Sequence, residues 1–192
     1  MIGILALQGD FEAHGKSLQR LGVPFREVRL ARDLEGLDGL IIPGGESTTM
    51  AKLLKIFDLL QPLIDFGNSG KPVLGTCAGS ILMCQRIEDW NLPLLGWIPA
   101  TIERNAYGCQ RESFFVQIDG GQWGGPNLPA YFIRAPRFLD TDPGVEVIFR
   151  HQGDISGVCY RNFTAITFHP ELSDDSRFHQ KWLEHAAIGT PA

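Results

Sequence analysis

A short glycine-flanked turn around Cys77 constrains the fold of this chain more than any other feature. The turn runs from Gly75 to Gly79, follows the apolar pair Val73-Leu74 and leads into a helix-like segment from Ser80 to Cys84. Glycines on both sides of the central residue allow the sharp strand-to-helix turn that lifts one side chain above a parallel sheet. The raised side chain here is a thiol, and a helix N-terminus beneath it favours the thiolate. The turn therefore predicts a cysteine nucleophile, although a free cysteine is more often a small buried hydrophobic side chain.

A cysteine nucleophile needs a base and a group that orients the base, and His169 suits this role best among the 5 histidines. It ends the apolar stretch from Ala165 to Phe168 and is followed by Pro170-Glu171. In extended backbone, residues two apart project to the same side and the proline restricts the pair, so Glu171 can hold His169. This predicts a Cys77-His169-Glu171 triad; the alternative is a strand-end histidine capped by a nearby acid. The remaining histidines fall in amphipathic helical patterns or a polar turn and are expected on the surface: His14, His179, His185 and His151.

A second glycine turn, from Pro43 to Ser47, lies between the apolar run Leu40-Ile41-Ile42 and a helical pattern that starts at Thr48. Two consecutive glycines allow a backbone N–H to point at a developing oxyanion, and the amide after the nucleophile is its natural partner. We therefore expect the N–H groups of Gly45 and Ala78 to form an oxyanion hole. A phosphate cradle or an ordinary turn are the alternatives, but no Gly-Lys-Ser/Thr follows, so this is not a Walker loop.

Length and composition favour one compact domain. The 192 residues, 44% of them hydrophobic, can bury one sizeable core, so a single domain over 1–192 is expected. A formal net charge of -5 without a lysine or arginine run argues against nucleic acid or an anionic membrane as a partner. The apolar start from Met1 to Leu7 is too short for a signal peptide or a membrane span and predicts a core strand. The chain has four cysteines, Cys77, Cys84, Cys109 and Cys159. They show no paired metal-type spacing, which predicts no metal site. The size and composition of the chain argue against a secreted disulfide framework, which predicts a reducing cytoplasmic location.

The order of strand and helix patterns predicts an α/β fold. Strand patterns lie at 2–7, 25–30 and 39–42, and helical patterns at 11–21, 48–66 and 78–87. Extended segments follow at 100–104, 113–118, 131–135, 145–150, 157–161 and 165–168, and acids at 174–175 announce a last helix. Alternating strands and helices indicate a mostly parallel sheet with helices on both faces, in three layers, and the later strands indicate an antiparallel addition. In such a sheet the site lies at the carboxyl ends of the strands.

The glycine turn at Pro43 to Ser47, the cysteine turn and the segment Phe168-His169-Pro170-Glu171, in this order, resemble the class I (triad type) glutamine amidotransferases. From Ile2 to about Trp182 the chain resembles one group of them, the glutaminase subunits of pyridoxal 5′-phosphate synthases. This narrower resemblance rests on further stretches, which are Leu7 to Asp10, Ser47 to Met50, Glu103 to Gly108, Ser113-Phe114 and Phe132 to Pro136.

The resemblance implies a flavodoxin-like fold and a glutaminase without a cofactor, which hydrolyses L-glutamine to L-glutamate and ammonia. It also implies a partner, the synthase subunit, that receives the ammonia for vitamin B6 biosynthesis. The glutamine contacts that it implies come from Gly45, Glu46, Ser47, Arg104, Ile133 and Arg134. The chemistry agrees, because an arginine fork can hold the carboxylate of a free amino acid. The apolar neighbours of Arg134 suggest that this arginine has a partner and is not a solvated surface residue.

Two other functions stay open: a glutaminase that serves a histidine or nucleotide pathway, and a non-catalytic binding module on the same fold. Three features depart from the pattern of the family: Cys109, Tyr107 and a glycine-rich loop from Gly120 to Asn127. None of them touches the predicted triad. The effect of this loop, and the roles of Cys84, Cys109 and Cys159, do not follow from the sequence.

Overall fold

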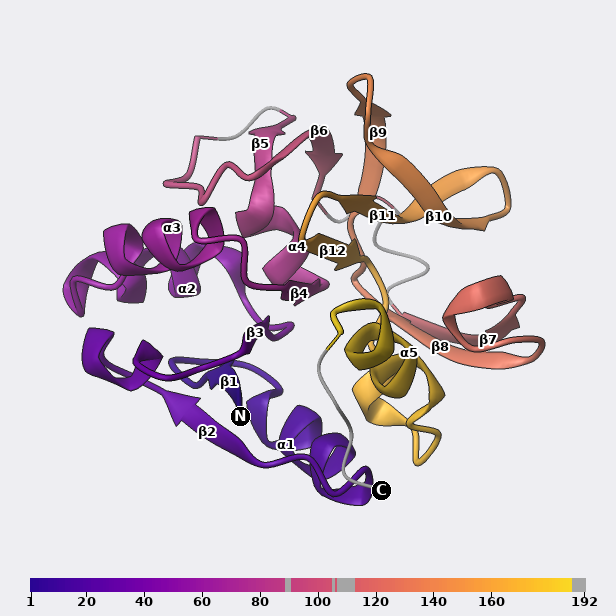
Figure 1. Cartoon of the computed structure of the whole chain (residues 1–192). Coiled ribbons are helices and arrows are strands. Elements are labelled where there is room, and N and C mark those ends of the chain that lie inside the picture. Colours follow the sequence, from indigo (N-terminus) through magenta and orange to yellow (C-terminus); the bar gives the residue numbers. More distant parts are fainter. Residues whose placement is uncertain (89–90, 105, 107–112, 188–192) are drawn as a thin grey trace.

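The computed structural model describes residues 1–88, 91–104, 106 and 113–187 (Figure 1). Tyr107 and Cys109, noted above as departures from the family pattern, lie outside these residues, as do parts of the stretch from Glu103 to Gly108.

One large sheet forms the centre of the structure, in the order β2-β1-β3-β4-β12-β11-β9-β6-β5, with β10 paired to β11. Its first five strands are all parallel: β2 (Phe25–Val28), β1 (Ile2–Leu5), β3 (Gly39–Ile42), β4 (Val73–Thr76) and β12 (Phe163–Ile166). The rest of the sheet adds β11 (Asp154–Tyr160), β9 (Arg137–Thr141), β6 (Ile98–Glu103), β5 (Cys84–Ile87) and β10 (Glu146–His151). These later strands join through antiparallel pairs, except that β5 is parallel to β6. A separate antiparallel hairpin consists of β7 (Ser113–Ile118) and β8 (Leu128–Ile133).

Helices cover both faces of the parallel strands, because successive strand residues enter two different hydrophobic clusters. Leu40 and Ile42 pack with α2 (Ser47–Ile56), α3 (Leu60–Asn68) and α4 (Ala78–Met83). Ile41, between them, packs on the other face with α1 (Phe11–Arg20) and α5 (Arg177–His185). Short 3₁₀ turns complete the chain: η1 (Ala31–Leu34), η2 (Gly121–Trp123) and η3 (Pro170–Leu172). The predicted three-layer arrangement, with a mostly parallel core and an antiparallel addition, is therefore confirmed (Figure 1).

Two of the predicted helices differ from the structure, which also has two strands, β5 and β9, that were not predicted. The helix expected over 48–66 is broken into α2 and α3 at Asp58, which has a left-handed φ of 51°. The helix expected to run to Ile87 ends at Met83, and the polar and half-buried residues that follow form the edge strand β5. Strand β9 has no counterpart in the prediction. Among the described residues, no helix is both long and apolar enough to cross a membrane.

Candidate active site

Cys77 occupies the predicted strand-to-helix turn, between the end of β4 and the start of α4. Its backbone is strained, with φ 47° and ψ −105°, a conformation that costs about 1–3 kcal/mol for a residue with a side chain and is concentrated at functional sites. The flanking glycines make the turn possible, because a Cβ on Gly79 would lie 2.1 Å from the carbonyl oxygen of Ile42 and a Cβ on Gly75 would lie 2.4 Å from Met83 Sδ. The thiol is largely buried and lines a small pocket.

His169 follows β12, the neighbour of β4, so both residues leave the carboxyl ends of adjacent parallel strands. Its N–H donates to the carbonyl oxygen of Tyr131 at 2.8 Å, and its Nδ1 lies 2.7 Å from Glu171 Oε1. The backbone argument for this pair is wrong in one respect. Glu171 lies in the 3₁₀ turn η3 and not in an extended segment, so a turn that begins at Pro170, and not strand alternation, brings the carboxylate to the imidazole.

The surroundings of His169 favour the imidazolium. Burial alone would lower the pKa of this histidine, but hydrogen bonds and charge from Cys77 and Glu171 raise it to about 11. For Glu171 the direction is opposite. Burial would raise the pKa of this carboxyl group, and the charges and hydrogen bonds of His14 and His169 hold it well below its ordinary value. The three side chains therefore form a chain of contacts with an ionised acid at one end and a thiol at the other.

The glycine turn after β3 packs directly on this group. A Cβ on Gly44 would lie 2.3 Å from His169 Cε1, so only glycine leaves room for the ring. The carbonyl oxygen of Gly44 accepts the N–H of Asp10 at 3.1 Å, and Gln8 Oε1 accepts the N–H of Glu46 at 2.7 Å. Both ends of the turn are thus held from the loop between β1 and α1.

One pocket of about 80 Å³ contains the thiol. It is lined by Cys77, Ala78, Ile81, Gly45, Glu46, Ser47, Arg104, Ile133 and Arg134. All the residues that the resemblance assigned to glutamine and to the oxyanion are among them, and they come from separate parts of the chain.

Arg104 and Glu46 both line this pocket and form an ion pair, with Arg104 Nη2 3.1 Å from Glu46 Oε1. Glu46 also caps α2, since its Oε2 accepts the N–H of Thr49 at 2.9 Å. Burial would raise the pKa of Glu46, but hydrogen bonds from Thr48 and Thr49 and the charge of Arg104 lower it. One side of the pocket therefore carries an ionised acid and an arginine.

The apolar neighbours of Arg134 do not bury it: its side chain is exposed and, within the described part of the chain, has no ion-pair partner. It lines the pocket, and glutamine as its partner stays a prediction. Its apolar neighbours turn away from it: Phe132 and Ala135 are buried while Ile133 and Arg134 face the pocket. Arg134 also has a left-handed φ of 43°, which is uncommon for a residue with a long side chain.

For two of the four histidines expected on the surface the prediction is wrong, because His14 and His179 are fully buried. His14 Nδ1 lies 3.0 Å from His179 Nε2, and His14 Nε2 lies 3.4 Å from Glu171 Oε1. Helical periodicity marked both residues as polar, but it could not show that α1 and α5 face each other beside the acid. His185 is exposed and His151 half-buried, as expected.

Asp10, His169 and Glu171 place one possible metal-ligating atom each within 4.8 Å of one another. The two buried members already hydrogen-bond each other, so the cluster is explained without an ion. Cys84 and Cys159 are poor nucleophiles, because burial raises the pKa of Cys84 above its ordinary range and that of Cys159 to about 11.

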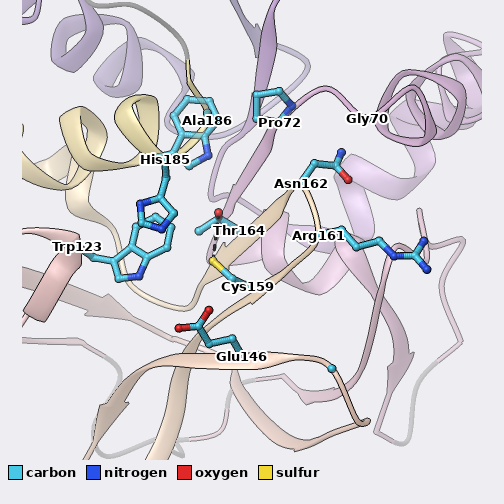
Figure 2. A pocket seen from close by; sticks show the side chains of 12 residues that line it. Gly70, Pro72, Trp123, Glu146, Cys159, Arg161, Asn162, Thr164, His185 and Ala186 are labelled. Atoms are coloured by element: carbon cyan, nitrogen blue, oxygen red, sulfur yellow. Dashed lines mark hydrogen bonds between the residues drawn. The ribbon is translucent and has the colours of Figure 1, made fainter.

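A second, larger pocket of about 390 Å³ lies at the opposite end of the sheet, where β4 and β12 begin. Figure 2 shows its lining, with Trp123 beside His185 and the contact between Cys159 Sγ and Thr164 Oγ1, at 3.4 Å. Trp123 belongs to the glycine-rich loop, which Arg177 holds through bonds to the carbonyl oxygens of Gly124, Pro126 and Asn127. The loop is therefore packed on α5, away from Cys77.

The fold and the pocket define the class of protein: a flavodoxin-like α/β domain of the class I amidotransferase type, with a cysteine, a histidine and an acid at the carboxyl ends of its strands. A family model described as the SNO glutamine amidotransferase family matches residues 4–187. The chain belongs to this family.

Individual relatives agree with this membership over nearly the full length. The pyridoxal 5′-phosphate synthase subunit PdxT of Thermotoga sp. (strain RQ2) is 45% identical over 183 residues, 95% of this chain and 97% of the relative. The protein of the same name from Shouchella clausii (strain KSM-K16) is 44% identical over 186 residues, 97% of this chain and 95% of the relative. A crystal structure of a glutamine amidotransferase matches with a TM-score of 0.92 and 41% identity, and covers 97% of this chain and 99% of that chain. The predicted family and fold are confirmed.

Proposed function

We propose that this chain is the glutaminase subunit of a pyridoxal 5′-phosphate synthase, which hydrolyses L-glutamine and delivers the ammonia to a synthase subunit. The observation that carries the proposal is the hydrogen-bonded pair His169 and Glu171, whose imidazole interacts with the thiol of Cys77, the one member of the three that lines the pocket. Vitamin B6 biosynthesis is favoured over a histidine or nucleotide pathway by the nearly full-length similarity to proteins named pyridoxal 5′-phosphate synthase subunit PdxT. A non-catalytic module would not need a cysteine with a strained backbone beside a charged histidine.

In the first step the Cys77 thiolate attacks the side-chain amide carbon of glutamine, and the carbonyl oxygen becomes an oxyanion. The N–H groups of Gly45 and Ala78 would hold this oxyanion. The His169 imidazolium then gives its proton to the leaving nitrogen, ammonia departs and a γ-glutamyl thioester remains. Glu171 keeps the imidazole oriented and stabilises its charge.

In the second step a water molecule, deprotonated by the now neutral His169, attacks the thioester carbon. The tetrahedral intermediate collapses, the Cys77 thiolate leaves and returns to its pairing with the imidazolium, and glutamate is released. For binding, Arg104 and Arg134 would hold the carboxylate of glutamine and Glu46 its ammonium group, with Gly45, Ser47 and Ile133 completing the wall. No cofactor or metal takes part in these steps.

Ammonia released into water is largely protonated and is then no nucleophile, so the proposed function requires a docked synthase subunit and a shielded route between the two sites. We expect the isolated chain to be slow and the synthase subunit to accelerate it. A thiol nucleophile also needs a reducing compartment, which agrees with a cytoplasmic enzyme.

Cys77→Ala tests the proposal, with Cys159→Ala as the matched control. Glutamate formation should disappear in the first variant and persist in the second, with and without the synthase subunit. A glutamine-like chloroketone should label Cys77 alone, as read by peptide mass spectrometry, because the pKa of Cys159 is raised by burial. Normal turnover by Cys77→Ala would refute the nucleophile, and equal turnover with and without the synthase subunit would refute the coupling.

A further inference from the structure

The mechanism leaves two buried titratable side chains without a role, His14 on α1 and His179 on α5. Both are completely shielded from solvent. Burying one polar ring without partners is costly, and packing alone seldom accounts for two buried histidine rings in contact. They lie behind the acid of the triad, on the side away from Cys77's pocket.

The contacts of His14 link three separate parts of the site. Its Nε2 lies 3.1 Å from Thr76 Oγ1 and 3.4 Å from Glu171 Oε1. Thr76 immediately precedes the nucleophile, and its Oγ1 accepts the N–H of Gly44 at 3.0 Å. One imidazole nitrogen therefore faces the triad acid and the residue that anchors the glycine turn.

The partners of His14 determine which of its nitrogens carries a proton. Glu171 is ionised and its Oε1 can only accept, so a bare Nε2 at 3.4 Å would set two lone pairs against each other in a buried site. A protonated Nε2 donates to Thr76 Oγ1 at 3.1 Å and places the same proton beside the carboxylate. With the ring proton of His14 on Nε2, its Nδ1 is an acceptor, and His179 Nε2–H donates to it.

The same arrangement explains the one ring atom that has no partner. Within the described part of the chain, His179 Nδ1 makes no hydrogen bond. With Nε2 protonated, this atom is a bare acceptor, and orphaned acceptors are tolerated better than orphaned N–H donors. The opposite tautomers would leave a buried N–H unpaired. The direction of donation thus runs from His179 to His14 and from His14 to Glu171.

We propose that His14 is a positioning residue of the glutaminase, which fixes the carboxylate of Glu171 through its Nε2–H and ties it through Thr76 to the turn at Gly44. The inference rests on the proposed triad. Glu171 Oε2 lacks a hydrogen-bond partner among the described residues, so Oε1 with its two histidines is the anchor of this group. Since rotation about the last side-chain bond of glutamate is soft, a second donor holds the oxygen that His169 needs.

His14 and His169 together lower the pKa of Glu171 against the effect of burial. Burial and the adjoining His14 lower the pKa of His179 to about 3, so the His179 ring is neutral, with one N–H to donate and one bare nitrogen.

Two substitutions separate positioning from packing. In His14→Gln the side-chain amide reaches the place of Nε2 and keeps a donor for Glu171 and Thr76, but it loses the contact with His179. In His14→Asn the amide reaches only the place of Nδ1, so it keeps the contact with His179 and loses the donor. Each variant gives up one of the two contacts of a buried ring, and we expect similar losses of melting temperature.

The two variants should differ in activity although their melting temperatures are similar. With the synthase subunit present, we expect kcat of His14→Asn to fall roughly 10- to 100-fold, the range for loss of an outer partner of a functional histidine, with KM for glutamine nearly unchanged. His14→Gln should recover most of kcat. Equal activity of the two variants, or losses that follow melting temperature alone, would overturn the positioning role.

A spectroscopic measurement covers the case in which a variant does not fold. Long-range ¹H–¹⁵N correlation spectra of the wild-type chain report which ring nitrogens of His14 are protonated. A protonated Nε2 supports the proposal, and a bare Nε2 overturns it whatever the activity data show. Failure of the proposed function has a different signature, since the wild-type chain with the synthase subunit would then form no glutamate while the His14 tautomer stayed as inferred.

Discussion

The hydroxyl oxygen of Thr76 accepts the backbone N–H of Gly44 at 3.0 Å, so the residue before the nucleophile holds the turn that carries the proposed oxyanion donor. Thr76 is the last residue of β4, and Gly44 lies in the turn that follows the neighbouring parallel strand β3. Gly44 in turn touches the ring of His169 closely enough to exclude any Cβ. Thiol, base and oxyanion turn are therefore fixed relative to one another by contacts between the backbone of Gly44 and two side chains, none of which involves the substrate.

Replacement of Thr76 by valine tests this connection. The change keeps the shape but removes the acceptor, and a buried N–H without a partner costs about 1–3 kcal/mol. We expect the free energy of unfolding in urea to fall by this amount. Because a shift of about 1 Å in a reacting group can cost about 100-fold in rate, kcat should fall by more than the loss of stability alone explains.

Thr167→Val is the matched control for this experiment. The hydroxyl of Thr167 is also buried, but it donates to the carbonyl oxygen of Ser156, which the N–H of Thr167 already satisfies. Its loss leaves no unpaired group, so the effect on stability should be smaller. Equal losses in both variants would contradict the special role of the bond to Gly44.

Gly44→Ala should inactivate the enzyme. The added Cβ would meet His169 Cε1 at 2.3 Å, and the ring cannot move aside without breaking the hydrogen bond between its Nδ1 and Glu171. Either the turn or the imidazole must shift, and we expect kcat to fall by roughly 100-fold or more. Steady-state glutaminase assays measure this.

Gly70→Ala provides the comparison for this substitution. Its Cβ would meet nothing within 4 Å, but its φ of 86° makes alanine strained, at a cost of about 1–2 kcal/mol. This variant should lose stability and keep kcat. If Gly44→Ala retained normal turnover, the close packing of turn and imidazole would not be needed for catalysis.

The architecture could be predicted from sequence where the local pattern and the tertiary environment agree. The buried runs at Leu40 to Ile42 and Val73-Leu74, each followed by a glycine turn, indicated parallel strands, and the structure has them. The break at Asp58 was missed because apolar spacing continues across it, although Pro62 marks the first turn of a new helix. Strand β5 was missed since its residues continue the helical pattern, and only pairing with β6 makes them extended.

The candidate site was visible in sequence as three motifs but not as a geometry. Spacing alone paired His169 with Glu171, but no sequence feature brings Cys77 to them; that proximity follows from β12 inserting next to β4. The buried pair His14 and His179 could not be found, because a histidine on an amphipathic helix is usually exposed and nothing local indicates a second helix against it. The roles of these residues, and the single-domain organisation, stay predictions.

Arg104→Lys should weaken glutamine binding more than catalysis. Lysine keeps the charge but loses the planar fork that grips a carboxylate in two bonds, and Arg104 lies in the pocket beside Glu46. We expect KM to rise about tenfold, the equivalent of one lost charge-assisted bond, with kcat within about threefold. Arg86→Lys, on the exposed strand β5 with partners Asp140 and Asp142, is the control and should change neither constant. An unchanged KM in Arg104→Lys would remove this residue from the glutamine site.

His179 should make the fold sensitive to acid. Its pKa in the folded chain is lowered from 6.5 to about 3 by burial and by His14, so between these values the unfolded chain binds a proton that the folded chain does not. The contribution of neutral His179 is therefore complete above pH 6.5 and is lost as pH falls towards 3, with a slope of up to about 1.4 kcal/mol per pH unit.

His179→Gln isolates this effect, because the amide can still donate to His14 Nδ1 but does not titrate. We expect the urea unfolding curves of the wild type to lose stability between pH 6.5 and 4 faster than those of His179→Gln, so that the two free energies converge or cross. His185→Gln, at an exposed position on the same helix, should leave the slope of the wild type unchanged. Parallel pH dependences for the wild type and His179→Gln would mean that the buried ring takes up its proton as readily in the folded chain as in the unfolded chain, which would contradict a neutral His179.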